Sequence, residues 1–545
     1  MHVKGSLYLT ALVPSKTQIQ PFTHKQILLI FSGLMTGLLL SALDQTIVAT
    51  ALPKIVGELG GLDYYSWIVT AYLLSTTVST PLYGKLSDLY GRRLMFQVAI
   101  LVFVAGSLFA GLAQGMLQLI FCRAVQGVGA GGLMAMTFAV VGDVVSPRQR
   151  GRYIGLLAGT WAFASVIGPL IGGFIVDNMS WRWVFLINLP IGFVAFAVTS
   201  SVLRLPTVYR SHRIDIEGVL FLVGGVSAVL LALVWGGTEY PWSSSLIRIL
   251  LIGGMALLVI FIWWENRAAE PILPLRLFKN SIFSVSSALG FLTGCGMFGG
   301  VIFLPLFLQV VSGVSATSSG LLLLPLTAGV VIGSVGSGRV ISHTGRYKIW
   351  PIGGLAFAAI GMFLLSLMTA NTSFFVSSLY MLIMGLGVGS TMQVTILVVQ
   401  NAVDHSDLGV ATSAAQFFRQ MGGSFGVAVF GSIMNYRLAA DLPSRVPPEA
   451  LEEVGGQLSA FLSSPEVIRS LPQAVSSGVI ESVELAIHAV FIWAVPPMIL
   501  GFILAWFLQE IPLRETIDTS SVVEGAGEVL DSLSKKAESP EDQEV

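Results

Sequence analysis

Three charged side chains of this sequence lie inside long apolar runs: Asp44, Arg123 and Arg419. A charge inside hydrocarbon is costly, so such residues are rare and commonly bind protons, ions or ligands. Loss of hydration and a neighbouring cation change the proton affinity of a carboxylate in opposite directions, so a site whose hydration changes can bind and release a proton. Asp44 is therefore the first candidate for proton binding. The alternative is a carboxylate held in a permanent ion pair.

Asp44 and Arg123 are expected to lie at similar depths. Asp44 is about eight residues from the outer end of its apolar run and Arg123 about five, which at ~1.5 Å per residue places both roughly 8–12 Å from the outer surface. An ion pair whose strength depends on protonation would couple proton binding to a change of conformation. The alternative for Arg123 is to brace helices through backbone carbonyls.

Arg419 lies about ten residues into its apolar run, near the middle of a span. It needs a partner, and the sequence leaves open whether this is a carboxylate, backbone carbonyls, water or an anionic substrate. Other aromatic and amide residues either line a cavity for amphipathic molecules or face lipid and neighbouring helices, among them Trp67, Tyr72 and Phe298. The predicted substrate cavity comprises Gln126, Trp161, Gln309, Gln393 and Arg419.

The composition requires lipid as the main solvent of the chain. Of 545 residues, 54% are hydrophobic and only 11% are charged, and the mean hydropathy is +0.81, so there is more apolar surface than a soluble fold could bury. The 29 Lys and Arg residues balance 30 Asp and Glu residues, which gives no electrostatic reason to expect a nucleic acid partner. Cysteines and histidines show no metal-ligand spacing, so no metal site is expected.

Apolar runs long enough to cross a bilayer recur along the chain. A span needs roughly 20 mostly apolar residues to cross a hydrocarbon core of ~30 Å. The pattern predicts an all-α polytopic membrane protein with fourteen spans: Ile27–Leu52, Ser66–Gly84, Leu94–Ala113, Leu117–Val141, Tyr153–Val176, Val184–Leu203, Ile216–Trp235, Leu246–Trp264, Ile282–Val311, Gly320–Val340, Ile349–Met368, Phe374–Val399, Val410–Met434 and Leu485–Leu508.

Basic residues are distributed unequally between the two sides of these spans. The loops on one side carry most of the Lys and Arg, whereas the short loops on the other side carry only Lys54, Arg182 and Arg248. Since short cytosolic loops are enriched in basic residues, both termini are expected in the cytosol. The two possible glycosylation sites, Asn178 and Asn371, then fall on the outer side.

A repeated loop predicts two related halves. Gly84–Arg93, after the second span, and Gly338–Arg346, after the tenth, share their glycine spacing and basic residues. Transporters built from such repeats bind substrate between them, near the middle of the membrane. The expected divisions are a cytosolic tail at 1–26, an N-terminal six-helix half at 27–203, a linker with two extra spans at 204–281, a C-terminal six-helix half at 282–508 that includes an outer loop at 435–484, and a disordered cytosolic tail at 509–545.

Several segments carry recognisable motifs. They are Gly84-x3-Asp88-x2-Gly91-Arg92-Arg93, Leu119-x3-Arg123-x2-Gln126-Gly127, Gly159 with Gly168-Pro169-x2-Gly172-Gly173, Leu43–Val48, and Trp181–Gly192. Through these segments the sequence resembles the major facilitator superfamily, and within it the fourteen-span drug:proton antiporters of the fungal toxin and multidrug efflux type.

The resemblance implies a major facilitator fold that exports amphipathic toxins, drugs or secondary metabolites in exchange for protons, with the proton gradient as energy source and no cofactor. It implies that Arg123 takes part in proton transfer, that Asp88 braces the two halves, and that Arg92 pairs with an acid, for which Asp143 is suitably placed. The alternative is a charged turn that only fixes topology. The glycines of the segment Gly159–Gly173 are expected to pack tightly against the tenth span.

Three other classes of function compete with efflux. An uptake or vacuolar carrier of the same fold, for basic amino acids or iron chelates, is the alternative within transport. An enzyme would need a cluster of nucleophile, base or metal ligands, or a phosphate-binding G-x-x-x-x-G-K-[ST] loop, and the sequence has neither. A receptor or channel is disfavoured by the repeated loop and the buried charges. We expect a monomer in the plasma membrane, with protons, a small molecule and lipid as its partners.

Overall fold

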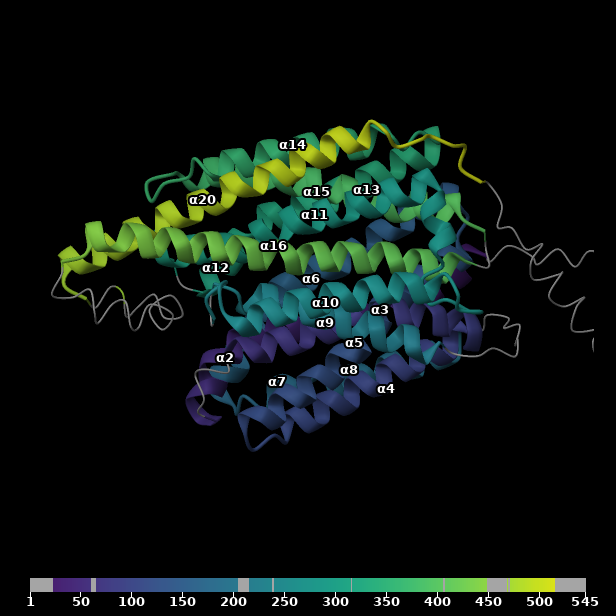
Figure 1. The fold of residues 1–545 in the computed structure, drawn as a ribbon, viewed down its shortest axis with the longest axis horizontal. Helices are drawn as coiled ribbons and strands as arrows, with labels where there is room; N and C mark the ends of the chain where they lie inside the picture. The colour runs from purple at the N-terminus through teal and green to yellow at the C-terminus, as the bar shows by residue number, and fades with distance from the viewer. Residues whose placement is uncertain are drawn as a thin grey trace, which may run out of the picture.

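The computed structural model describes residues 23–59, 65–203, 215–237, 240–314, 316–404, 407–447, 468 and 471–514, and they form a bundle of long helices (Figure 1). The start of the predicted N-terminal tail, the amphipathic part of the predicted outer loop and the end of the predicted C-terminal tail lie outside the described residues. In chain order the helices are α2 (His24–Leu59), α3 (Tyr65–Tyr90), α4 (Arg92–Gly111), α5 (Met116–Val144), α6 (Pro147–Asn178), α7 (Trp183–Leu186), α8 (Asn188–Val202), α9 (Ile216–Trp235), α10 (Ser245–Glu265), η2 (Leu275–Lys279), α11 (Ser281–Leu306), η3 (Phe307–Val311), α12 (Ala316–Leu322), α13 (Leu324–Thr344), α14 (Ile349–Leu365), α15 (Phe374–Ala402), α16 (Leu408–Arg445) and α20 (Gln473–Ala505).

Each of the fourteen predicted spans coincides with helix in the described part of the chain. There, eleven helical segments are long and apolar enough to cross a membrane, and α14 is a shorter apolar helix. Helices α3 and α16 have 26 and 38 residues, but their Ser, Thr, Gln and Arg side chains lower their hydropathy. The predicted sixth and tenth spans are each interrupted, by Ile187 between α7 and α8 and by Leu323 between α12 and α13.

The helices form two six-helix bundles with a hairpin of α9 and α10 packed between them. Two apolar cores lie within the first bundle and the largest lies within the second. A further core joins the hairpin to both bundles, since it contains Leu222 and Leu230 of α9, Val78 of α3 and Phe417 of α16. The two inserted helices therefore pack against each half through apolar side chains.

The predicted outer loop at 435–484 is helical at both of its ends. Helix α16 continues to Arg445 and α20 begins at Gln473, and the two run side by side beyond the other helices (Figure 1). Short stretches that alternate polar and apolar residues fail a test for spans, but residues four apart share one face of a helix and can be buried there. The buried residues with this spacing are Leu438 and Leu442 of α16 and Val475, Val479 and Val483 of α20.

Candidate functional site

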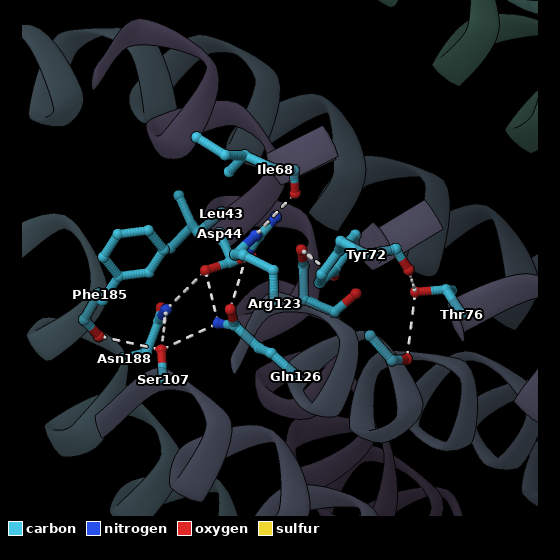
Figure 2. A network of polar contacts seen from close by, with 12 residues as sticks. Leu43, Asp44, Ile68, Tyr72, Thr76, Ser107, Arg123, Gln126, Phe185 and Asn188 are labelled. Carbon is cyan, nitrogen blue, oxygen red and sulfur yellow. Dashed lines mark hydrogen bonds and ion pairs between the residues drawn. The ribbon is translucent and has the colours of Figure 1, made fainter. Parts of the chain in front are cut away.

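Asp44 lies at the centre of a buried polar network in the first bundle (Figure 2). Its Oδ2 is 2.6 Å from Nη1 of Arg123, while its Oδ1 accepts hydrogen bonds from Gln126 Nε2 at 2.7 Å and from Asn188 Nδ2 at 2.8 Å. The same two amide groups donate to the hydroxyl of Ser107 at 2.9 and 2.8 Å. One carboxylate thus connects side chains from four helices.

The sequence places these groups on facing surfaces. Arg123 and Gln126 are three residues apart on α5, so both point the same way, and Arg123 Nη1 also donates to Gln126 Oε1 at 2.6 Å. Asn188 is the first residue of α8, directly after the interruption at Ile187. Asp44 is fully buried and Arg123 only 2% exposed. A desolvated pair of this kind persists only when hydrogen bonds satisfy the remaining polar atoms, as they do for this carboxylate.

Aromatic rings cover the guanidinium of Arg123. Its Cζ lies 4.2 Å from the ring centroid of Tyr72 and 5.8 Å from that of Phe185, and its Nε donates to the carbonyl of Ile68 at 3.4 Å. These contacts come from α3 and α7, so Arg123 is held by helices on both sides of α5. If Asp44 bound a proton, the charge of Arg123 would lose its counter-ion but keep its aromatic and carbonyl contacts.

A second charged cluster lies at one end of the molecule, where α3 turns into α4 within Gly84–Arg93 and where α13 ends within Gly338–Arg346. We call this end of the molecule the basic end. Arg92 is 2.6 Å from Asp88 and 2.7 Å from Asp143, and its Nη1 also donates to the Ser87 hydroxyl. The other oxygen of Asp88 accepts a hydrogen bond from the backbone N–H of Val410, at 3.0 Å. Because Val410 lies in the first turn of α16, Asp88 links the two halves directly.

Other contacts close the basic end between the halves. Arg148 of α6 donates to the carbonyls of Ser342 and His343, at 3.2 and 3.5 Å, and Gln400 of α15 donates to the carbonyl of Phe138, at 2.9 Å. Nearer to the middle, Gln420 of α16 reaches Thr80 Oγ1 at 3.5 Å.

The predicted contact of the fifth-span glycines with the tenth span is wrong in its residues. Helices α6 and α13 do meet, but through Gly151 and Gly155 of α6, at the basic end. Gly168 and Gly172 face Thr46 and Thr50 of α2 instead, and Cβ atoms added at Gly159 or Gly173 would meet nothing within 4 Å. Pro169 lies in α6 and packs near Gly320 of α12. The motif therefore reaches the other half through Pro169, while the glycines that contact α13 lie earlier in α6.

The residues of the predicted cavity do not come together as one group. Gln126 belongs to the Asp44 network, Trp161 packs against the apolar cores of the first bundle, and Gln309 lies 3.4 Å from Ser319 in the second. Gln393 is buried in α15 and Arg419 lies part-buried in α16. The possible glycosylation sites, Asn178 and Asn371, are both exposed at the end opposite the basic end.

Asn188 and Ser107 were missed by sequence reasoning. Both are uncharged polar residues in apolar runs, where such residues are common. For Asn188 a signal existed, because it lies within Trp181–Gly192, one of the segments that carry the family resemblance.

Comparisons with known proteins agree with this geometry. The chain matches the Major Facilitator Superfamily over residues 34–427. It is 38% identical over 511 residues to the multidrug transporter protein MdtP of Bacillus subtilis, covering 89% of this chain and 93% of that protein. It is 34% identical to the efflux pump FUS6 of Gibberella moniliformis, covering 90% and 89%.

Two further relatives extend the comparison. An uncharacterized MFS-type transporter of Mycobacterium tuberculosis is 41% identical, covering 94% of this chain and 73% of that protein. The solved structure of the proton:xylose symporter XylE superposes with a TM-score of 0.60 at 13% identity, covering 92% of this chain and all of that one, which shows the fold alone.

The chain is a membrane transporter, not an enzyme, and it belongs to the major facilitator superfamily. Its relatives include proteins named as a multidrug transporter and as efflux pumps, which confirms the family predicted from the motifs.

Proposed function

We propose that this protein exports amphipathic small molecules in exchange for protons. The names of its relatives, a multidrug transporter and fungal efflux pumps, support export. The observation that carries the proton coupling is the ion pair of Asp44 with Arg123, which is buried within membrane-spanning helices. A carboxylate at such a depth is expected to handle protons or substrate.

Protonation of Asp44 is the coupling step in this proposal. The neutral carboxyl group attracts Arg123 less, so the helices that carry the pair, α2 and α5, are free to shift against each other. Gln126 and Asn188 hold the carboxylate in position by donating hydrogen bonds to its Oδ1. Proton binding would therefore change the contacts of four helices in the N-terminal half at once.

The closed basic end supports an assignment of conformation. With the basic loops facing the cytosol, the halves are in contact on the cytosolic side, so the protein is in an outward-facing arrangement. Asp88 stabilises this state through Val410 N–H, and Arg92 orients Asp88 while also pairing with Asp143. Transport would require these contacts to break and re-form in each cycle.

The membrane arrangement belongs to the same proposal. Both termini lie in the cytosol, the halves comprise residues 27–203 and 282–508, and the protein acts in the plasma membrane. Epitope tags at either terminus of intact cells should be protected from an external protease. A C-terminal tag that is cleaved from outside would require an odd number of spans.

Flux in proteoliposomes tests the function. An acidic lumen should drive uptake of an exported compound into the vesicle, and a protonophore should abolish that uptake. A panel of amphipathic toxins and dyes should be tried, because the sequence does not identify the substrate. Accumulation driven by an alkaline lumen would instead indicate an uptake carrier that moves protons and substrate in the same direction.

A further inference from the structure

The second half of the chain contains a part-buried cation with no acidic residue at its depth. No Asp or Glu occurs between Glu270 and Asp404, nor between Asp407 and Asp441. Helices α11, α13, α14 and α15 therefore have no carboxylate, and neither has the part of α16 that crosses the membrane. Arg419 lies in that part of α16.

The guanidinium of Arg419 has two hydrogen-bond acceptors among the described residues. Its Nε donates to Gln416 Oε1 at 2.9 Å, and its Nη1 lies 3.4 Å from the sulfur of Met392 on α15. A thioether is a weak acceptor. No carboxylate of the described residues is within ion-pair distance, 4.0 Å, of this side chain.

Two fully buried arginines of the same chain have oxygen acceptors of a kind that Arg419 lacks. Arg123 has a carboxylate at 2.6 Å. Arg150 donates to the carbonyl of Val145, at 2.8 Å, and to that of Gly142. Among the described residues Arg419 has neither a carboxylate nor a backbone carbonyl as acceptor, so of the four partners that such an Arg can have, water and an anionic ligand are left.

Arg419 lies next to a contact between the two halves. It is eleven residues from the start of α16, which corresponds to ~16 Å and so to about half of the hydrocarbon thickness. The adjacent Gln420 contacts Thr80 and Met134 of the N-terminal half, at 3.5 and 3.6 Å. On the other side, Gly294 of α11 packs directly on the backbone of Arg419.

Three amide side chains of α15 and α16 have a polar atom without a partner among the described residues, and one of them, Gln416, contacts Arg419 directly. Gln416 is fully buried and its Nε2 has no hydrogen-bond partner among the described residues, and the same is true of Gln393 Oε1 and Gln420 Oε1. A buried donor without an acceptor costs about 1–3 kcal/mol, so native structures rarely leave several together. Gln416 Nε2 and the remaining N–H groups of Arg419 are donors that a single acceptor group could satisfy together.

We propose that Arg419 and Gln416 bind the anionic headgroup of the transported molecule, and that the substrates are amphipathic organic acids. A carboxylate can take two parallel hydrogen bonds from the guanidinium and a third from the Gln416 amide. Met392 and Met134 offer polarizable, adaptable contacts for the apolar remainder, a property suited to varied ligands. This inference rests on the proposed efflux function, whose substrate class it specifies.

Binding of matched probes to the purified full-length protein tests the proposal. The probes are dansylglycine and 1-naphthoate, each compared with its own uncharged amide. Wild type should bind each acid at least tenfold more tightly than the amide. Arg419→Gln should lose this preference by weakening acid binding alone, Arg419→Lys should keep part of it, and the exposed control Arg248→Gln should keep all of it.

Thermal stability separates a ligand site from a helix brace. Without ligand, Arg419→Gln should have a Tm equal to or above that of wild type, because an uncompensated charge is removed. A clearly lower Tm for Arg419→Gln would overturn the proposal. So would a wild-type protein that binds neither acid more tightly than its amide, or an Arg419→Gln variant that keeps the wild-type preference for acids.

Flux distinguishes the failure of this site from the failure of the transport function. If the acids bind through Arg419 but no proton gradient moves them, the anion site stands and the export proposal fails. If proton-driven export of other compounds is observed while acids and amides bind equally, export stands and the anion site fails.

Discussion

Gly151 of α6 and Gly338 of α13 pack backbone to backbone across the two halves, since a Cβ atom added at Gly151 would lie only 2.6 Å from the Cα of Gly338. Together with the hydrogen bond from Val410 N–H to Asp88, this contact holds the basic end closed. The contact leaves no room for a side chain, so it offers a direct means of opening that end.

Substitution of Gly338 by Ala should favour the state in which the basic end is open. Overpacking costs about 1–3 kcal/mol, and only the closed state bears this cost. Distances between spin labels at the two ends should show a larger open population. Gly336→Ala is the matched control, since a Cβ there meets nothing within 4 Å; equal distributions in both variants would contradict the closed-end assignment.

Asp44→Asn should abolish the dependence of flux on the pH gradient, because the titratable proton is removed with little change in volume. Flux, substrate binding and surface abundance should be measured on the same variant. Asn188→Ala is the comparison: it removes one hydrogen bond to the same carboxylate, at about 1–3 kcal/mol, but keeps the proton site. It should slow transport yet preserve its pH dependence.

A purely structural role for Asp44 gives the opposite pattern. Arg123 would be left as an uncompensated buried charge, at about 3–5 kcal/mol, and low abundance would be the main symptom. Normal pH-driven flux at normal abundance would remove Asp44 as the coupling residue.

Asp88→Asn and Arg92→Ala should reduce turnover more than abundance. Both side chains are mostly buried at the basic end, 9% exposed for Arg92 and 13% for Asp88, so the loss exceeds the contribution of a solvent-exposed pair, about 0–1 kcal/mol. The closed state should lose the most, because the bond to Val410 N–H crosses between halves. Transport rate normalised to surface protein measures this; unchanged rates in both variants would reduce the loop to a topology signal.

Arg276→Ala should impair turnover modestly, by about two- to fivefold. Arg276 lies after α10 and pairs with Asp407, at 2.8 Å, directly before α16, while the nearby Lys85 and Glu270 connect the same segment to α3 at 3.9 Å. The two-helix insertion thus contacts both sides of the closed end. Arg267→Ala is the control, because Arg267 stacks on Trp263 within α10, at 4.0 Å. Equal effects of the two variants would count against a coupling role.

Hydropathy predicted the fold because lipid sets a minimum length of roughly 20 residues for every span. Helices as different as α4, with 20 residues, and α16, with 38, both reach this length. The meeting of Asp44 and Arg123 was also foreseeable from depth alone. The choice of neighbour for each glycine was not, because it depends on which helix meets each face of α6, as Gly168 against α2 and Gly151 against α13 show.

Two other features escaped prediction for physical reasons. The role of Asn188 depends on which faces of α2, α5 and α8 meet, and no periodicity in one helix specifies its neighbours. The continuation of α16 and α20 depends on a narrow apolar seam that a hydropathy average dilutes with the polar residues around it. Both belong to tertiary packing and not to the preference of a single segment.

Helix α16 is continuous from Leu408, beside Asp88, to Arg445, beyond the other helices. Its 38 residues correspond to a rod about 57 Å long. A lever of that length magnifies rotation: a tilt of about 10° at the closed end would carry the far tip through about 10 Å. The tip of the α16–α20 hairpin is thus a natural pointer, on which a fluorophore or antibody fragment would read the position of a gate at the other side of the membrane.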